Sequence, residues 1–408
     1  MTDTIGTLPE HDMTRAPGCP FDPGPALRQR QTEAPITRVR LANGKTPWLV
    51  TRYAEQRALL ADPRISSDPT KPQYPSPAER SGEASLSFIL MDDPEHARLR
   101  RMVTSAFAIK KVAAMRPGVQ RIVDDLIDRM LAGPKPVDLV EAFALPVPSL
   151  VICQLLGVPY TDHDFFQENS RVIIHRDSTM DQRNEAMKRL FGYLQGLIQE
   201  RLTRPADDLL SDLARRVNEG ELTERMATET GVLMLIAGHE TTANMIALGT
   251  VALLEHPDQL ARLRDDASPE LVTSAVNELL RYLTITHGGR RRTALADIEI
   301  GDVVIREGDG VILANELGNR DPEVFEDPDT LDLGRDARRH VAFGFGVHQC
   351  LGQPLARMEL EVVYSTLYRR IPDLRLAVPL DEVPFKHDGL VYGVYRLPVT
   401  WLSMADEI

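Results

Sequence analysis

The chain has 408 residues, enough for one large domain or for two or three of average size. Acidic residues outnumber basic ones by 60 to 47, and the resulting formal net charge of -13 excludes a generally basic surface for nucleic acid. Apolar residues make up 43% and charged residues 26% of the chain. These values are typical of globular domains, so a disordered or fibrous protein is also excluded.

The cysteines and the amino terminus both favour a cytoplasmic protein. Cys19, Cys153 and Cys350 are odd in number and far apart, which favours a reducing compartment over a disulfide framework. Residues 1–12 have acidic side chains where an export signal has Lys or Arg, and no apolar segment follows them. The chain has no uninterrupted apolar run of about 18 residues, the length that a membrane span needs. We therefore expect a cytoplasmic protein without a membrane anchor.

The first part of the chain predicts irregular structure and a small sheet. Residues 1–35 are rich in Pro, Gly and charge and show no periodicity, so we expect an irregular N-terminal arm. Strand-like segments within 36–53 flank Asn43-Gly44, a pair favoured in type I′ hairpin turns. A short helix is expected over 54–61, and a proline-rich loop over 63–77 follows it.

From residue 88 to residue 283 the spacing of apolar residues predicts helices. The longest is expected from about Leu222 to His256 and would extend roughly 50 Å at ~1.5 Å per residue. Ser268 and Pro269 form a suitable cap and first turn for another helix, which reaches Leu283. The region 162–202 is also helical by its spacing, and its polar part is equally consistent with a lid and with an ordinary exposed loop.

After residue 290, strand-like runs return over 298–305 and 310–313, and a last helix is predicted over 355–370. We find neither an internal repeat nor a linker between two cores. The expected architecture is therefore a single domain, 1–408, that is mainly α-helical with small β-sheets.

The strongest local motif is Phe343-Gly-Phe-Gly-Val-His-Gln-Cys350-Leu-Gly352. Its glycines allow a tight turn and the close approach of a flat ligand, and the helix start after Cys350 favours a thiolate. A lone cysteine is most often a small buried hydrophobe, which suits Cys153 but does not explain the glycines and His348 beside Cys350. A dinucleotide-binding loop is rejected because Gln349 occupies the place of the third glycine.

A second motif, Ala237-Gly-His-Glu-Thr-Thr242, places polar residues in the apolar middle of the longest predicted helix. Buried polar groups cost free energy unless they are hydrogen-bonded. A zinc-protease site is excluded because Ala243 stands where that pattern needs a second histidine. Two interpretations remain open: the threonines bond to carbonyl groups one turn earlier while Glu240 meets an arginine, or these polar residues face a ligand.

A third pattern pairs Glu278 with Arg281 on the helix predicted over 268–283. The spacing of three residues places the two side chains next to each other. Because Glu278 belongs to an otherwise apolar stripe, the pair predicts a buried structural network rather than an exposed ion pair of little effect.

In this order and separation, the three motifs resemble the haem-thiolate monooxygenases of the cytochrome P-450 family. The resemblance covers essentially the whole chain after about residue 15. The segments Ala144-Leu-Pro-Val-Pro-Ser149 and 342–353 are similar to soluble actinobacterial members that act on secondary metabolites and steroid-like molecules. The resemblance implies the cytochrome P-450 fold, with haem b (iron protoporphyrin IX) between a long central helix and the cysteine-loop helix.

The resemblance also implies a role for each matching residue. Cys350 matches the axial thiolate ligand of the haem iron, and Glu240 and Thr241 match the acid and alcohol that deliver protons to dioxygen. The residues that match the propionate-binding positions are His96, Arg100, Arg292 and His348, although for either histidine alone a surface or capping role is the favoured interpretation. Further haem contacts are implied for Ala237, Phe343, Gly344 and Gly352. The residues that match a structural triad are Glu278, Arg281 and Arg335.

The implied reaction inserts one oxygen atom from dioxygen into a hydrophobic small molecule, such as a polyketide, macrolide, terpenoid or steroid-like compound, and is typically a hydroxylation. Since the chain has no room for a flavin or nicotinamide domain, electrons must come from a ferredoxin and its NAD(P)H-dependent reductase. We expect an acidic ferredoxin to dock by charge on basic residues near the haem motifs. These residues are Arg98, Arg101, Lys110, Lys111, Arg338, Arg339 and Arg357.

The resemblance places the substrate pocket on the distal face of the haem. The expected walls are Phe88, Ile89, Leu233, Ile236, Thr284, Val391 and Tyr392. Mostly apolar walls imply an apolar substrate. His287, Arg290 or Arg291 could meet a polar substrate group, and the sequence does not choose among them.

Three other activities remain open. The chain could be a haem-thiolate peroxygenase or dehydratase that needs no ferredoxin, or a haem protein that binds ligands without turnover. The intact Glu240-Thr241 pair favours dioxygen activation over both. A cysteine hydrolase that uses Cys350 and His348 is disfavoured, because residues two apart on a tight loop do not easily align as nucleophile and base.

Overall fold

The computed structural model describes residues 8–12, 14–76, 88–174, 178–266, 268–387, 389 and 391–402. The chain divides into two compact units. The first comprises residues 1–100, 277–350 and 387–392, and the second comprises 101–276, 351–386 and 393–408. The single domain expected from the sequence stays a prediction.

The first unit is built on a five-stranded sheet. Its strands are β1 (Ile36–Arg38), β2 (Trp48–Val50), β8 (Gly310–Leu313), β5 (Arg290–Ala294) and β3 (Ile65–Ser66), in that spatial order. Strands β2 and β8 are parallel, with Leu49 opposite Ile312, and the other neighbours are antiparallel. The same unit contains a hairpin of β6 (Ile298–Ile300) and β7 (Val303–Ile305), helices α1 (Pro25–Glu33), α2 (Tyr53–Ala61) and α12 (Asn315–Gly318), and the 3₁₀ turns η1 (Phe88–Leu90) and η5 (Gly346–His348).

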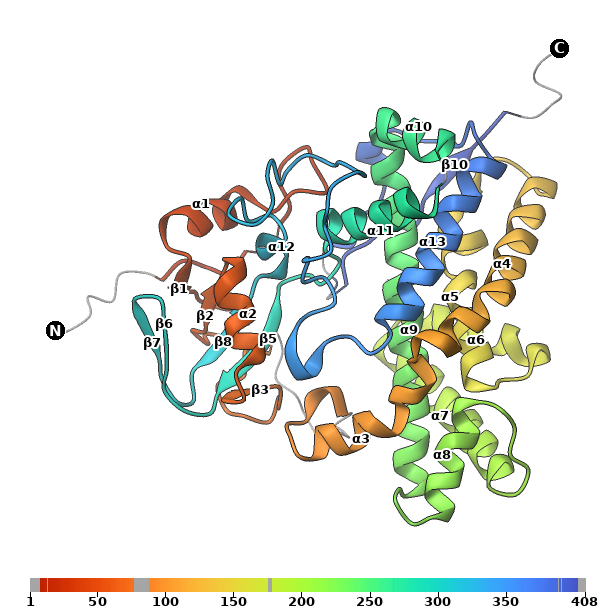
Figure 1. Cartoon of the computed structure of the whole chain (residues 1–408), viewed down its shortest axis with the longest axis horizontal. Helices are drawn as coiled ribbons and strands as arrows, with labels where there is room; N and C mark the ends of the chain where they lie inside the picture. Colours follow the sequence, from red (N-terminus) through yellow and green to blue (C-terminus); the bar gives the residue numbers. More distant parts are fainter. Residues whose placement is uncertain are drawn as a thin grey trace. The chain divides into compact units, whose positions relative to one another are not determined.

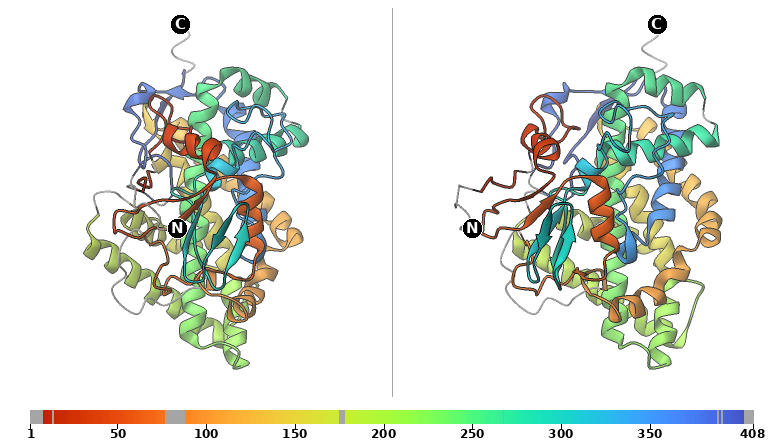
Figure 2. Two further views of the ribbon diagram at one scale, coloured as in Figure 1. Left: turned by 90° about the vertical axis from the view of Figure 1, so that its left-hand side faces the viewer. Right: turned by 60° about the vertical axis from the view of Figure 1, so that its left-hand side comes forward.

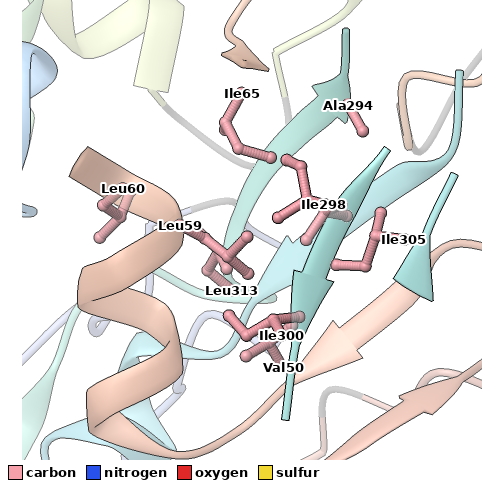
Figure 3. Close-up of a cluster of buried hydrophobic side chains, with 10 residues drawn as sticks. Val50, Leu59, Leu60, Ile65, Ala294, Ile298, Ile300, Ile305 and Leu313 are labelled. Atoms are coloured by element: carbon pink, nitrogen blue, oxygen red, sulfur yellow. The ribbon is translucent and has the colours of Figure 1, made fainter. Parts of the chain in front are cut away.

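An apolar core joins α2 to these strands. Leu59 and Leu60 of α2 and Leu313 of β8 belong to one buried cluster, whose members are at most 9% exposed (Figure 3). Ile298 and Ile300 enter the same cluster from one face of β6, since alternate side chains of a strand share a face. Figure 2 shows α2 running alongside the strands of this unit. The packing fixes the end of α2, against which the cysteine loop lies.

The second unit is mainly helical. Its helices are α4 (Ile109–Ala132), α5 (Pro146–Leu156), α6 (His163–Ile174), α7 (Met180–Thr203), α8 (Leu209–Asn218), α9 (Glu224–Glu255), α10 (Pro257–Asp265) and α13 (Gln353–Arg370). Helix α9 packs against α5, α7 and α13, and α13 packs against α4 (Figure 1). A small sheet has the order β4 (Val137–Asp138), β10 (Pro398–Thr400), β9 (Arg375–Leu376), and the short turns are η2 (Ser105–Phe107), η3 (Val140–Ala144), η4 (Tyr160–Asp162) and η6 (Leu380–Glu382). Helices α3 (Glu95–Thr104) and α11 (Pro269–Leu283) have residues in both units.

The long helices agree with the sequence prediction because strong local signals set their ends. Thr223 caps α9 by accepting a hydrogen bond from the Met226 N–H at 3.1 Å, and α9 ends just before Pro257. Pro269 begins α11, and α13 has a proline in its first turn. The mainly helical architecture with small sheets is confirmed. Among the described residues, every helix is too short or too polar to cross a membrane.

Two local expectations are wrong. Residues 25–33 of the supposedly irregular arm form α1, because Pro25 starts a helix that Leu27 and Gln31 anchor by burial. The Asn43-Gly44 pair does not form a type I′ turn, which requires positive φ at both central residues. Of this pair, Gly44 alone has positive φ, +83°, and its N–H donates to the Leu41 carbonyl at 2.9 Å.

Candidate functional site

Cys350 ends a tight loop in the first unit. Its N–H donates to the Phe343 carbonyl at 2.8 Å, which closes the loop, and the Cys350 thiol is exposed. Gly344 and Gly346 have φ values of +73° and +72°, which other residues rarely adopt. A Cβ on Gly346 would lie 2.2 Å from the Leu60 carbonyl oxygen at the end of α2. The loop therefore requires glycine for both backbone conformation and space.

The first unit brings together the four residues predicted to bind carboxylates. The rings of His96 and His348 lie 4.0 Å apart, and Arg100 donates to the Gln349 carbonyl at 2.6 Å. Burial is the main cause that lowers the pKa of His348 to about 3, and the neighbouring His96, Arg292 and Arg100 act in the same direction. Burial is also the main cause that lowers the pKa of Arg292 to about 10. Such desolvation and mutual repulsion are relieved when an anion binds among these groups.

His96 offers a specific atom to that anion. Its Nδ1 lies 3.0 Å from Asp93 Oδ1, a contact that lowers the pKa of the Asp93 carboxyl. The Nε2 of His96 is buried and has no hydrogen-bond partner among the described residues. A buried polar atom without a partner is costly, and a ligand carboxylate would satisfy it. A thiol beside a buried donor and clustered arginines fits the haem that the resemblance implies, with its two propionates.

Arg290 lies against the cysteine loop, although the sequence suggested a contact with substrate. Its Nη2 donates to the Ala342 carbonyl at 3.0 Å, and a Cβ on Gly344 would lie 3.1 Å from the Arg290 guanidinium carbon. Burial lowers the pKa of Arg290, and the charge of Cys350 acts in the opposite direction. Arg290 and Arg292 share one face of β5 by alternation, and this is the sequence signal that would have placed both near the loop.

In the second unit, α9 presents a partly exposed stripe in its buried middle. The stripe consists of Leu233, Ile236, Ala237, Glu240 and Thr241, which follow one another at helical spacings of three and four. Thr241 Oγ1 donates to the Ala237 carbonyl at 2.8 Å, as one of the two interpretations predicted. The Asn244 amide donates to the Glu240 carbonyl at 2.8 Å. The Thr241 hydroxyl is therefore hydrogen-bonded within its own helix although its side chain is partly exposed.

Glu240 pairs with a lysine rather than with the arginine expected in that interpretation. Lys386 Nζ lies 3.7 Å from Glu240 Oε1, and the Lys386 side chain is 8% exposed. Next to Glu240, burial lowers the pKa of His239 to about 4, so this histidine is neutral at pH 7. Sequence reasoning missed Lys386, because no local spacing links a residue of the carboxyl-terminal part to α9.

The residues Glu278, Arg281 and Arg335 come together in the first unit. Arg281 Nε and Nη2 each donate to one oxygen of Glu278 at 2.7 Å, and Arg335 Nε donates to Glu278 Oε1 at 3.1 Å. Glu278 and Arg281 are fully buried, and Arg281 Nη1 also donates to the carbonyls of Asn319 and Pro328. A buried ion pair is tolerated when its remaining donors are satisfied in this way. The network ties α11 to the segment that leads to the cysteine loop.

Three of the predicted pocket walls, Thr284, Val391 and Tyr392, belong to the first unit. Thr284 is 2% exposed; its hydroxyl donates to the Arg281 carbonyl at 3.1 Å and accepts from Asn319 Nδ2 at 2.7 Å. Tyr392 is 1% exposed, and its N–H donates to the Ile285 carbonyl at 2.8 Å. Val391 forms an antiparallel bridge in the same place. Thr284 and Tyr392 are thus interior residues, and their place on a pocket wall stays a prediction.

The other predicted walls differ in exposure. Phe88 is buried and Ile89 is 46% exposed in η1, whereas Leu233 and Ile236 are partly exposed on α9. Pro77 of the proline-rich loop and residues 175–177 of the possible lid lie outside the described residues. The apolar side chains of the α9 stripe are therefore the best-defined candidates for substrate contact.

Comparisons with known proteins agree with this geometry. The family model described as Cytochrome P450 matches residues 27–386. Cytochrome P450 GfsF from Streptomyces halstedii is 54% identical over 404 residues, which covers 98% of each chain. Its crystal structure has a TM-score of 0.94 and 55% identity, and the match covers 96% of this chain and 100% of that one.

Two further relatives have names that state what they act on. Vitamin D3 dihydroxylase from Streptomyces griseolus is 46% identical, with 98% of this chain and 100% of that protein covered. The structure of the mycinamicin VIII C21 methyl hydroxylase from Micromonospora griseorubida, bound to mycinamicin VIII, has a TM-score of 0.87 and 42% identity, with 95% of this chain and 98% of that chain covered.

Proposed function

Because this chain belongs to the cytochrome P450 family and is a haem-thiolate monooxygenase, we propose that Cys350 is its haem ligand and that it hydroxylates an apolar small molecule of secondary metabolism. The observation that supports this proposal is the exposed Cys350 thiol on a loop that requires glycine, in the same unit as the buried, unpartnered Nε2 of His96.

Several elements would hold the haem. Cys350 would supply the thiolate, and His96, Arg100, Arg292 and His348 would bind the propionates. The residues that would contact the porphyrin are Ala237, Phe343, Gly344 and Gly352. The triad of Glu278, Arg281 and Arg335 keeps the loop in place through its buried ion pairs. When bound, the haem supplies the activation of dioxygen.

Glu240 and Thr241 move the protons that this chemistry consumes. Both lie on the partly exposed stripe of α9, and the Thr241 hydroxyl already donates to the Ala237 carbonyl. Its oxygen therefore remains free to accept a hydrogen bond from a water or a substrate group. Glu240, one residue earlier, carries the carboxylate that exchanges protons with solvent.

The substrate is a macrolide, a terpenoid or a steroid-like compound such as vitamin D3. Relatives named for vitamin D3 and for mycinamicin VIII support this class, as do the apolar side chains Leu233 and Ile236. Titration with vitamin D3 and with mycinamicin VIII tests it: a ligand should change the spin state of the ferric protein, and turnover should yield a product with one additional oxygen atom. If neither compound, nor a wider library of apolar metabolites, changes the spectrum, the substrate class is wrong.

The electrons come from a ferredoxin and its reductase in the cytoplasm, where NAD(P)H is available. Arg101, Lys110 and Lys111 are exposed cations of the second unit, whereas Arg338 is already paired with Asp336 at 2.7 Å. The double variant Arg101→Glu and Lys111→Glu should slow reduction by ferredoxin about tenfold at low salt and weaken its salt dependence. Arg338→Glu is the matched control with a smaller effect. Unchanged reduction rates would contradict docking at this site.

A further inference from the structure

Lys386 faces Glu240 from the carboxyl-terminal part of the second unit. Its Nζ lies 3.7 Å from Glu240 Oε1, with the lysine side chain 8% exposed and the glutamate side chain 30% exposed. Lysine is almost never so deeply buried unless a partner compensates its charge. We propose that Lys386 is a positioning residue that holds the Glu240 carboxylate and thereby controls proton delivery. This inference rests on the proposed function, in which Glu240 moves protons.

The backbone beside Lys386 is fixed against the same turn of α9. The Lys386 N–H donates to the Gly393 carbonyl at 2.8 Å. A Cβ on Gly393 would lie 1.7 Å from Asn244 Oδ1, so this glycine allows direct contact between the backbone and α9. Asn244 in turn donates to the Glu240 carbonyl at 2.8 Å. Lys386 is therefore held in place by contacts that do not involve its own ammonium group.

The charges around Glu240 favour control by Lys386. The adjacent His239 is neutral at pH 7, because burial, together with the charge of Lys386, lowers its pKa to about 4. The Lys386 ammonium also lies 5.6 Å from the centre of the Tyr395 ring, which favours a cation at this position. At 3.7 Å the ammonium attracts the carboxylate without a hydrogen bond of normal length. The carboxylate is thus held by charge and still able to rotate during proton transfer.

A double-mutant cycle tests this coupling without an identified substrate. The haem-loaded full chain and the variants K386M, K386R, E240Q and K386M/E240Q are supplied with NAD(P)H, a ferredoxin and its reductase in air-saturated buffer, so that both electrons reach the haem. The rate of dioxygen consumption at saturating ferredoxin is then measured in H2O and in D2O. We expect E240Q to slow this rate about tenfold, K386M to slow it at least about threefold, and K386R to stay within about twofold of the wild type.

The rate of the double variant K386M/E240Q, compared with that of E240Q, decides whether Lys386 acts through Glu240. If Lys386 acts through Glu240, K386M adds no further slowing in the E240Q background, and both single variants change the H2O/D2O rate ratio in the same way. Equal slowing by K386M in both backgrounds, or slowing by K386R as large as that by K386M, would overturn the inference. The shorter neutral variant K386Q replaces K386M if the latter fails to bind haem.

The same measurements show separately whether Glu240 moves protons, which is the premise of the inference. The reduced carbon monoxide spectrum of each variant shows whether the haem-thiolate centre is intact. An unchanged rate in E240Q with an intact spectrum would contradict the proposed role of Glu240, and the inference about Lys386 would fall with it. A tenfold effect of E240Q with no effect of K386M would overturn the inference alone.

Discussion

Around the cysteine loop, charged groups from distant parts of the first unit meet, whereas the Thr241 hydroxyl of the α9 stripe bonds within its own helix. The loop needs positive φ at Gly344 and Gly346 and clearance from Leu60. The hydroxyl of Thr241 needs only the carbonyl of Ala237 one turn earlier. We therefore expect changes in the loop to damage the fold and the haem site together, and changes on α9 to alter the chemistry while the fold stays intact.

We expect the largest loss of stability from a substitution in the cysteine loop. Gly346→Ala should lower the free energy of unfolding by more than about 4 kcal/mol and prevent haem binding, since its Cβ would clash with the Leu60 carbonyl and its φ is strained. The matched control is Gly220→Ala, which has a φ of +75° but no atom within 4 Å of the new Cβ. The control should cost about 1 kcal/mol. Urea unfolding followed by circular dichroism distinguishes the two, and equal losses would contradict the role of the clash.

Each unit contains a buried histidine that makes stability depend on pH. Burial lowers the pKa of His239 in the second unit and of His287 in the first to about 4. In the unfolded chain these histidines are protonated below about pH 6.5, whereas in the folded chain they stay neutral down to about pH 4. The free energy of unfolding therefore falls as the pH drops from about 6.5 to 4. His239→Gln should remove up to about 3 kcal/mol of this loss. His287→Gln should remove a separate share, and the double variant should show their sum.

These variants are compared through the slope of the unfolding midpoint against pH. If His239→Gln has the same slope as the wild type, then His239 is protonated in the folded protein, in conflict with its burial. A double variant no less acid-sensitive than either single variant would show that the two sites are not independent.

The smallest expected effect on the fold is on α9. Thr241→Ala should change the free energy of unfolding by less than about 1 kcal/mol, because the lost hydrogen bond is local. The fraction of electrons that reach product, rather than hydrogen peroxide, should fall about tenfold. Thr230→Ala is the matched control, since Thr230 makes the same bond to the Met226 carbonyl on the same helix. A similar loss of coupling in both variants would contradict a specific role for Thr241.

The helices and the motifs were predictable from the sequence because their signals are local. Thr223 and Pro257 mark the ends of α9, and the glycines beside Cys350 mark a constrained loop. The helix α1 was missed because burial of Leu27, a tertiary effect, stabilises it.

Contacts between distant residues were not predictable in this way. The close approach of the His96 and His348 rings and the pairing of Lys386 with Glu240 join segments far apart in the chain, and no spacing encodes them. Arg290 is an intermediate case, since the alternation along β5 could have placed it beside Arg292 near the cysteine loop.

The central claim is that Cys350 is the thiolate ligand of the haem. The most direct test is the absorption spectrum of the reduced protein under carbon monoxide for the wild type, Cys350→Ala and Cys153→Ala. Cys153 is buried, and burial raises the pKa of its thiol to about 12, so it offers no thiolate at neutral pH. We predict a strongly red-shifted Soret band in the wild type and in Cys153→Ala that is lost in Cys350→Ala. The same red-shifted band in Cys350→Ala, or its loss in Cys153→Ala, would contradict the assignment.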